Sequence, residues 1–137
     1  MDPASLVQQA DRCLTGLQEH VQDGWLIRAK AMAEYRAGRM EPALEGLLKA
    51  ETMFHGEDED AEKVVISFFL GMAYQRLNRA EEAKVKYQQG LRLMEKAFGG
   101  LDRYQPGKGD WSGWAWCQLV RREAEAVLSA KDPGKKP

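Results

Sequence analysis

The chain has 137 residues, with 20 basic against 21 acidic side chains, a net charge of −1 and an isoelectric point near 6.1. This balance argues against the basic footprint of a nucleic-acid-binding domain, so no nucleic-acid partner is expected. No apolar run is long enough to span a bilayer, and the first residues lack a signal peptide's basic start and apolar core, so no membrane association is expected. The apolar share of 44% is typical of one globular domain with a buried core.

The first predicted element is a helix over residues 1–22. Asp2 is placed to cap its start, and apolar residues recur at spacings of three and four from Leu6 to Val21. Gly24 follows as the expected stop, because glycine adopts the left-handed backbone that ends many helices.

A helical hairpin is predicted next, over residues 24–54. Its first helix runs to Ala37, and Gly38 supplies the turn. The second helix is expected to start at Met40 or one residue later. Pro42 fixes that start, because a proline is tolerated in the first turn of a helix and breaks the hydrogen-bond ladder elsewhere.

A second hairpin is predicted over residues 60–98, and it repeats the first at a distance of 40 residues. The shift pairs Gly38 with Asn78 at the turn, and Ala43 with Ala83 where two helices come close. Small residues fall on small residues, and glycine and asparagine are the two residue types that most readily adopt a left-handed turn. The sequence therefore predicts an internal repeat.

The polar stretch 55–62 separates the two hairpins. Its acidic residues lie just before or within the first turn of the next helix, where negative charge complements the helix dipole. A calcium-binding loop is the alternative, but the stretch lacks the alternating Asp or Asn, the central Gly and the Glu at position twelve that such a loop needs. We expect the acidic residues to stabilise the helix start.

The remainder of the chain is predicted as a loop over 101–109, a capping helix over 110–130 and a disordered tail over 131–137. Asp110 is placed to cap the helix. Its apolar residues follow one side and its charged residues the other, as expected of a helix that covers the open face of a stack.

Aromatic residues gather around the start of this last helix: Tyr104, Trp111, Trp114 and Trp116. Trp114 and Trp116 cannot face the same way, because residues two apart on a helix point about 200° apart. We favour the interpretation that the 101–109 loop covers Trp111 and Trp116. In the alternative, Tyr104, Trp111, Trp116 and Arg122 form a second interface for a partner.

The second hairpin also carries a spaced set of packing residues: Leu70, Gly71, Tyr74, Ala83 and Tyr87. The first three follow the spacing L-G-x-x-Y, an alanine comes nine residues later, and an aromatic follows after four more. This pattern resembles the tetratricopeptide repeat (TPR), over roughly residues 25–98. The chain is similar to TPR segments of multidomain bacterial signalling proteins, although Ser67 stands where the pattern has tryptophan.

The resemblance implies an all-α fold. About six helices would form TPR-like antiparallel hairpins in a short right-handed solenoid, ending in a capping helix, as a single domain over residues 1–130. It also implies a concave groove that binds a protein or peptide. The groove residues that the repeat register implies are Trp25, Arg28, Met32, Tyr35, Arg36, Phe68, Met72, Gln75 and Arg76. Their guanidinium groups suit a partner that carries carboxylates.

No catalytic constellation is recognisable. Cys13 and Cys117 lie far apart, and neither they nor His20 and His55 have partners at metal or triad spacing. No phosphate-binding glycine loop occurs either. We expect buried free thiols, a reducing cytoplasmic setting, no metal and no cofactor. The sequence thus predicts a non-enzymatic protein-binding module. The alternative is an architectural subunit that assembles, with itself or with others, through the tryptophan-rich helix.

Overall fold

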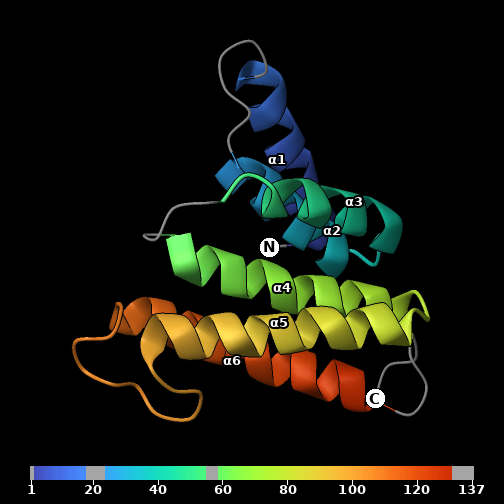
Figure 1. The fold of residues 1–137 in the computed structure, drawn as a ribbon. Helices are drawn as coiled ribbons and strands as arrows, with labels where there is room; N and C mark the ends of the chain where they lie inside the picture. Colours follow the sequence, from blue (N-terminus) through green and yellow to red (C-terminus); the bar gives the residue numbers. More distant parts are fainter. Residues whose placement is uncertain (1, 18–23, 55–58, 131–137) are drawn as a thin grey trace. The chain divides into compact units, whose positions relative to one another are not determined.

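The computed structural model describes residues 2–17, 24–54 and 59–130, the first segment without its side chains beyond residue 11. Within these ranges the chain forms helices and no strand, which confirms the all-α prediction (Figure 1). The six helices are α1 Pro3–Leu17, α2 Gly24–Arg36, α3 Met40–Glu51, α4 Asp60–Arg76, α5 Ala80–Phe98 and α6 Trp111–Ser129.

Several predictions concern residues outside this description: His20, His55, Asp58, the side chain of Cys13, the last turn of the 1–22 helix and the 131–137 tail. Backbone contacts divide the chain into two compact units, residues 1–54 and 55–137, and each is described by itself. The single domain expected over residues 1–130 stays a prediction.

In the first unit, α2 packs against both α1 and α3. The hairpin of α2 and α3 is tight at Gly46, where an added Cβ would lie 2.9 Å from the Cβ of Ala31. Pro42 is the third residue of α3, in the first turn, where its missing N–H costs no intrahelical hydrogen bond. The predicted start at Met40 is therefore confirmed.

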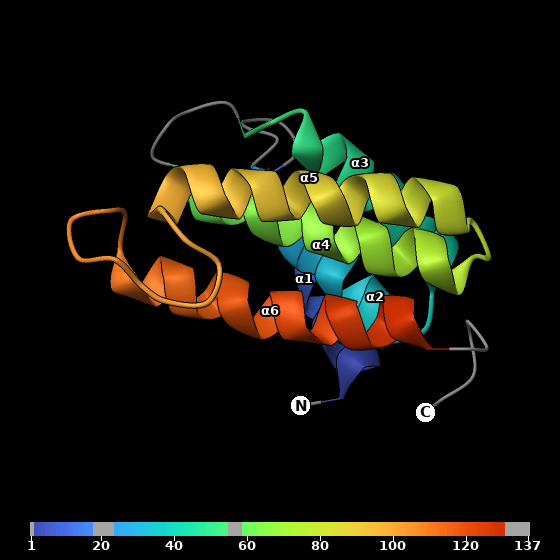
Figure 2. The same cartoon turned by 60° about the horizontal axis from the view of Figure 1, so that its bottom comes forward.

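In the second unit, α4 packs against α5 and α6, and α5 also contacts α6. Figure 2 shows the three helices running side by side. Gly71 allows α5 to come close, because an added Cβ would lie 3.2 Å from the Ala83 carbonyl oxygen. All of α4 from Val64 to Gln75 is buried, so this helix is the core of the unit.

The two hairpins repeat the same backbone turn. Gly38 and Asn78 both have a positive φ, of 82° and 62°. The Arg39 N–H donates to the Glu34 carbonyl at 2.9 Å, and the Arg79 N–H donates to the Tyr74 carbonyl at the same distance. Each of these pairs is offset by the predicted 40 residues. The turn geometry thus recurs at the spacing that the sequence indicates.

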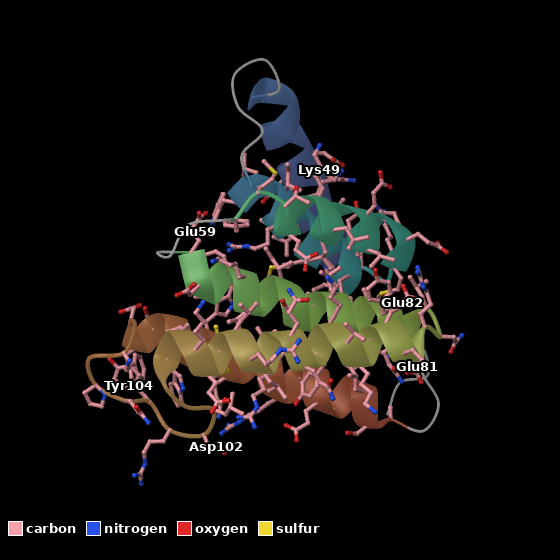
Figure 3. All side chains as sticks on the ribbon, viewed as in Figure 1. Lys49, Glu59, Glu81, Glu82, Asp102 and Tyr104 are labelled. Atoms are coloured by element: carbon pink, nitrogen blue, oxygen red, sulfur yellow. The ribbon has the colours of Figure 1, made fainter. Side chains whose placement is uncertain are left out.

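A loop joins α5 to α6. Gly99 ends α5 with a φ of 75°, and the side chain of Asp110 caps α6 by accepting from the Gly113 N–H at 3.1 Å. Figure 3 marks Asp102 and Tyr104 on this loop, at the end of the unit opposite Glu81 and Glu82. The starts of α4 and α6 and the end of α5 lie together at the end of the unit that carries this loop, where residues of all three line one cavity.

Candidate functional site

Three of the predicted groove residues lie on one surface stripe of α2. Trp25, Met32 and Arg36 follow each other at spacings of seven and four, which places them on one side of a helix. Trp25 is 54% exposed, Met32 is half-buried and Arg36 is exposed. The stripe is about 16 Å long at 1.5 Å per residue. It presents an indole and a guanidinium group at the surface.

Arg28 and Tyr35, on the same helix, are buried. The Arg28 guanidinium carbon lies 5.8 Å from the centre of the Phe54 ring, within the range of a cation–π contact. Nearby, the buried Glu34 carboxylate is 3.7 Å from the Arg39 guanidinium. Arg28 therefore serves the packing of α2, and its head group is not displayed to a partner.

The predicted groove residues of α4 are placed differently. Phe68 and Met72 have no exposed surface, Gln75 is buried and Arg76 is half-buried. Phe68 fills the space over α5, because an added Cβ on Gly90 would lie 2.6 Å from its ring, and its ring centre is 5.6 Å from that of Tyr87. The surface role predicted for Phe68 and Met72 does not fit this burial, which makes both of them core residues.

The aromatic cluster also differs from the interpretation favoured above. The loop covers Trp114, whose ring centre lies 6.0 Å from that of Tyr104, while Trp111 is 60% exposed. The Tyr104 hydroxyl donates to the Gly109 carbonyl at 3.3 Å, which closes the loop on itself beside α6. Trp116 is half-buried and borders a cavity. The loop therefore leaves Trp111 at the surface.

Trp111 begins a surface stripe that runs along α6. The stripe, which we call the α6 stripe, consists of Trp111, Ala115, Leu119, Arg122 and Ala126. Their spacings of four, four, three and four place them on one helix face. Ala115 is half-buried and the other four are exposed, Leu119 at 67%. Sequence reasoning missed Leu119, although it follows Trp111 by eight residues, a spacing that places both on one face of a helix.

A cavity of about 470 Å³ lies where the starts of α4 and α6 meet the end of α5. Aromatic and small residues form its walls, among them Phe98, Trp116 and Gly113. Three carboxylates line it as well: Asp60, Glu62 and Asp110. No basic side chain is among the described residues that line it. We call it the acidic cavity. Sequence reasoning assigned Asp60 and Glu62 to the helix dipole and Asp110 to the cap of the last helix, and it did not bring the three together.

Two of the carboxylates at the cavity, Asp60 and Asp110, have a partner in the structure, and the third, Glu62, affects the pKa of Cys117. Lys63 Nζ lies 3.5 Å from the Asp60 carboxylate. The Ser112 hydroxyl and then the Gly113 N–H donate to Asp110 and lower its pKa, so it stays ionised at neutral pH. Burial, and after it the negative charge of Glu62, raise the pKa of Cys117 to about 12. The Cys117 thiol is thus neutral and buried, as predicted for a free thiol.

Arg121 fixes the first part of the loop to α6. Its Nη1 donates to the Leu101 carbonyl at 2.9 Å, to the Asp102 carboxylate at 3.0 Å and to the Gln118 side chain at 3.2 Å. Burial also raises the pKa of Tyr87, which interacts with Arg121. This cluster ties α5, the loop and α6 together and so helps to shape that end of the unit.

Among the described residues, no group of three or more His, Cys, Asp or Glu is placed to hold a metal ion. No described helix is both long and apolar enough to cross a bilayer. Comparison with protein-family models, curated proteins and solved structures finds no match to this chain.

Proposed function

We propose that this chain is a non-catalytic module of tetratricopeptide-repeat type that binds a segment of another protein. The observation that carries the proposal is the hairpin built twice, with matching turn hydrogen bonds 40 residues apart. Repeated hairpins of this kind bury a shared core and present rows of side chains to a partner. Bacterial origin and a cytoplasmic location stay predictions.

The surface proposed for the partner is the α2 stripe of Trp25, Met32 and Arg36. Tryptophan and arginine are the residue types most enriched at the centres of protein interfaces. The exposed Arg36 can pair with a carboxylate in a bidentate contact, so an acidic segment is the partner proposed. Phe68 and Met72 have no part in this surface because they are buried.

Site-specific photo-crosslinking tests this proposal. A benzophenone amino acid is placed at position 25 of the full chain, and the matched control carries it at position 85. Trp25 and Val85 are 54% and 59% exposed, so the two probes are equally accessible. Irradiation in native lysate should join position 25 to a defined protein, identified by mass spectrometry, and excess unlabelled chain should suppress that adduct.

The control and the stripe variant complete the test. Position 85 should give no adduct with the same protein, and adding Arg36→Glu to the position-25 probe should weaken the adduct at least tenfold. The same adduct from both positions, or none from position 25, would remove the α2 stripe as a binding surface. Circular dichroism should show unchanged helix content in every variant, since all of the substituted side chains are exposed.

A further inference from the structure

A second cavity, of about 240 Å³, lies between α2 and α3, and we call it the hairpin cavity. Ile27, Ala31 and Gly46 form its apolar walls, and charged side chains line the rest. It lies on the opposite side of α2 from the α2 stripe, because Glu34, which lines it, is two residues from Met32 and so points about 200° away. Its volume is below the roughly 300–1,000 Å³ of sites for drug-sized ligands, so it suits a small occupant.

Glu34 is a buried carboxylate whose hydrogen bonds are incomplete. It is 5% exposed, and its Oε2 accepts no hydrogen bond. Arg39 Nη1 lies 3.7 Å from that oxygen, which is beyond the reach of a hydrogen bond, and the Arg39 side chain is half exposed. Burial of a carboxylate is costly unless donors meet it. Glu34 therefore offers an acceptor to a donor group that displaces Arg39.

The second hairpin carries an aromatic ring at the position equivalent to Glu34. This residue is Tyr74, and the Arg79 guanidinium carbon lies 4.8 Å from the centre of its ring. Arg79 is also held by Glu82, to which its Nε donates at 2.8 Å. Both hairpins nevertheless have the same turn. The carboxylate of Glu34 is therefore a feature that the hairpin turn does not need.

The charged groups of the cavity follow one another along the two helices. An added Cβ on Gly46 would lie 2.9 Å from that of Ala31, so these two residues are level. Glu34 lies three residues from Ala31 towards the hairpin turn, and Lys49 lies three residues from Gly46 in the opposite direction. These two charges are thus about 9 Å apart along the cavity, at 1.5 Å per residue. Glu45, next to Gly46, lies between them.

Two of these charged side chains are not paired with any part of the protein. Glu45 and Lys49 are exposed, and neither forms an ion pair within the described part of the chain, although they lie four residues apart on one helix. Lys30 lines the cavity as well, but its Nζ pairs with Asp11 at 2.7 Å. The cavity therefore presents a buried carboxylate at one end, an exposed carboxylate in the middle and an ammonium group at the other end.

We propose that the hairpin cavity binds a free basic amino acid, arginine, a ligand beyond the protein segment proposed for the α2 stripe. Its guanidinium group donates to Glu34, its α-ammonium group pairs with Glu45 and its carboxylate pairs with Lys49. A guanidinium group can give a carboxylate two parallel hydrogen bonds, which the 3.7 Å contact of Arg39 does not.

The charge pattern favours the free amino acid over a residue of a polypeptide. The α-ammonium and carboxylate groups of an amino acid are neighbours, as are Glu45 and Lys49 on successive turns of α3. A residue inside a polypeptide has neither of these two charges, because both groups are taken up in peptide bonds. It would leave Glu45 and Lys49 without their partners.

NMR titration of the full, isotope-labelled chain with L-arginine gives the first test. The amide signals of residues 27–34 and 42–49, the segments that line the cavity, should shift and saturate. A titration that moves none of these signals up to about 10 mM arginine overturns the proposal.

Three analogues each lack one charge of the ligand. Citrulline has a neutral urea in place of the guanidinium group, N-acetyl-arginine lacks the ammonium group, and agmatine lacks the carboxylate. Each should bind at least tenfold more weakly than arginine, because one of the three ion pairs is then missing. An analogue that binds as tightly as arginine overturns the pair that it lacks, and with it the proposal.

A charge reversal at the edge of the cavity tests the site from the side of the protein. Lys49→Glu should weaken arginine binding at least tenfold, because a carboxylate then faces the carboxylate of the ligand; Figure 3 marks Lys49 on α3. Lys84→Glu is the matched control, since Lys84 is an equally exposed class of lysine on α5 and the net charge changes by the same amount. Equal weakening by both substitutions would mean that arginine responds only to overall charge, and would overturn the proposal.

Glu34→Gln tests the buried end of the cavity. It keeps the size of the side chain and removes its charge, so arginine binding should again fall at least tenfold in a chain that circular dichroism shows to be folded. Unchanged binding in the folded variant overturns the role of Glu34, and the Lys49→Glu result decides the proposal if the variant does not fold. The Lys49→Glu chain should still give the position-25 adduct, so the two proposals fail separately.

Discussion

The first helices of the two hairpins, α2 and α4, use equivalent positions in opposite ways. Trp25 is 54% exposed, while Val65, 40 residues later, is fully buried. Met32 is half-buried, while Met72 has no exposed surface. The backbone turns that follow these helices are nevertheless the same. A shared position in a repeat therefore does not decide whether a side chain reaches the surface.

The cause is visible in the composition of the two helices. From Val64 to Tyr74, α4 carries no charged residue, whereas α2 carries Arg28, Lys30 and Glu34. A helix that is apolar on all sides must be buried on all sides, and one with a polar side keeps that side near water. α4 is thus an interior helix, whereas α2 keeps one face exposed.

The largest expected effect is a difference in the free energy of unfolding between alanine substitutions at the equivalent methionines Met72 and Met32. Met72→Ala should lower the free energy of unfolding by about 2–5 kcal/mol, because it leaves a cavity in the core. Met32→Ala, at the equivalent but half-buried position, should cost less than about 1 kcal/mol. Urea denaturation followed by circular dichroism measures both. Equal losses would mean that α2 is as much an interior helix as α4.

The thiol of Cys117 reports how α6 covers α4. Its sulfur lies 3.6 Å from the Ala61 carbonyl oxygen, and its pKa is raised from 9.0 to about 12. In a Cys13→Ser background, a thiol reagent at pH 8 should react about a thousandfold more slowly than with the unfolded chain, because so little thiolate is present. A raised pKa stabilises the fold below pH 9, and this contribution should fade as the pH rises towards 12. Rapid labelling of the native protein would show that α6 leaves α4 uncovered.

Overpacking of α4 gives a smaller loss. Gly71→Leu should destabilise the chain by about 1–3 kcal/mol, because the added side chain must displace the α5 backbone at Ala83. Lys84→Leu adds a similar side chain at an exposed site of α5 and should change stability by less than about 0.5 kcal/mol. Thermal and urea unfolding compare the two. A tolerated leucine at position 71 would contradict the close approach of the helices.

The smallest effect concerns helix starts. α4 has no side-chain cap and is held by burial, whereas α6 is capped by Asp110. Because the pKa of Asp110 is lowered in the fold, its contribution is present above the ordinary aspartate pKa and is lost as the pH falls through the lowered value. Asp110→Asn should keep a cap and flatten the fall in melting temperature below pH 4. If the melting temperature falls with pH in the same way in the unsubstituted and the Asp110→Asn chains, the ionised Asp110 does not stabilise the start of α6.

Much of the fold could be predicted because the signals that end helices are local. Gly38 and Asn78 mark the turns, Gly99 ends α5 and Asp110 starts α6, each through its own backbone or side chain. The start of α4 at Asp60 agrees with the start predicted for the second hairpin, because acidic residues are stabilised in a first turn.

The surfaces could be predicted only in part, because exposure depends on what packs over a residue. The α2 stripe followed from the repeat register, but the same register placed the buried Phe68 and Met72 in the groove. The uncharged stretch of α4 from Val64 to Tyr74 was the sequence signal that distinguishes its buried groove positions from the exposed ones of α2. The exposure of Trp111 could not be read from the sequence, since it depends on the path of the loop, whose Tyr104 stacks on Trp114.

Hydrogen–deuterium exchange of the intact chain tests most directly the claim that α4 is an interior helix while α2 keeps one face exposed. Amides of residues 64–75 should be the slowest in the chain, because they exchange only when the unit unfolds. Amides of α2 should exchange faster than these, because one face of that helix is exposed. Exchange in residues 64–75 that is as fast as exchange in α2 would contradict the account.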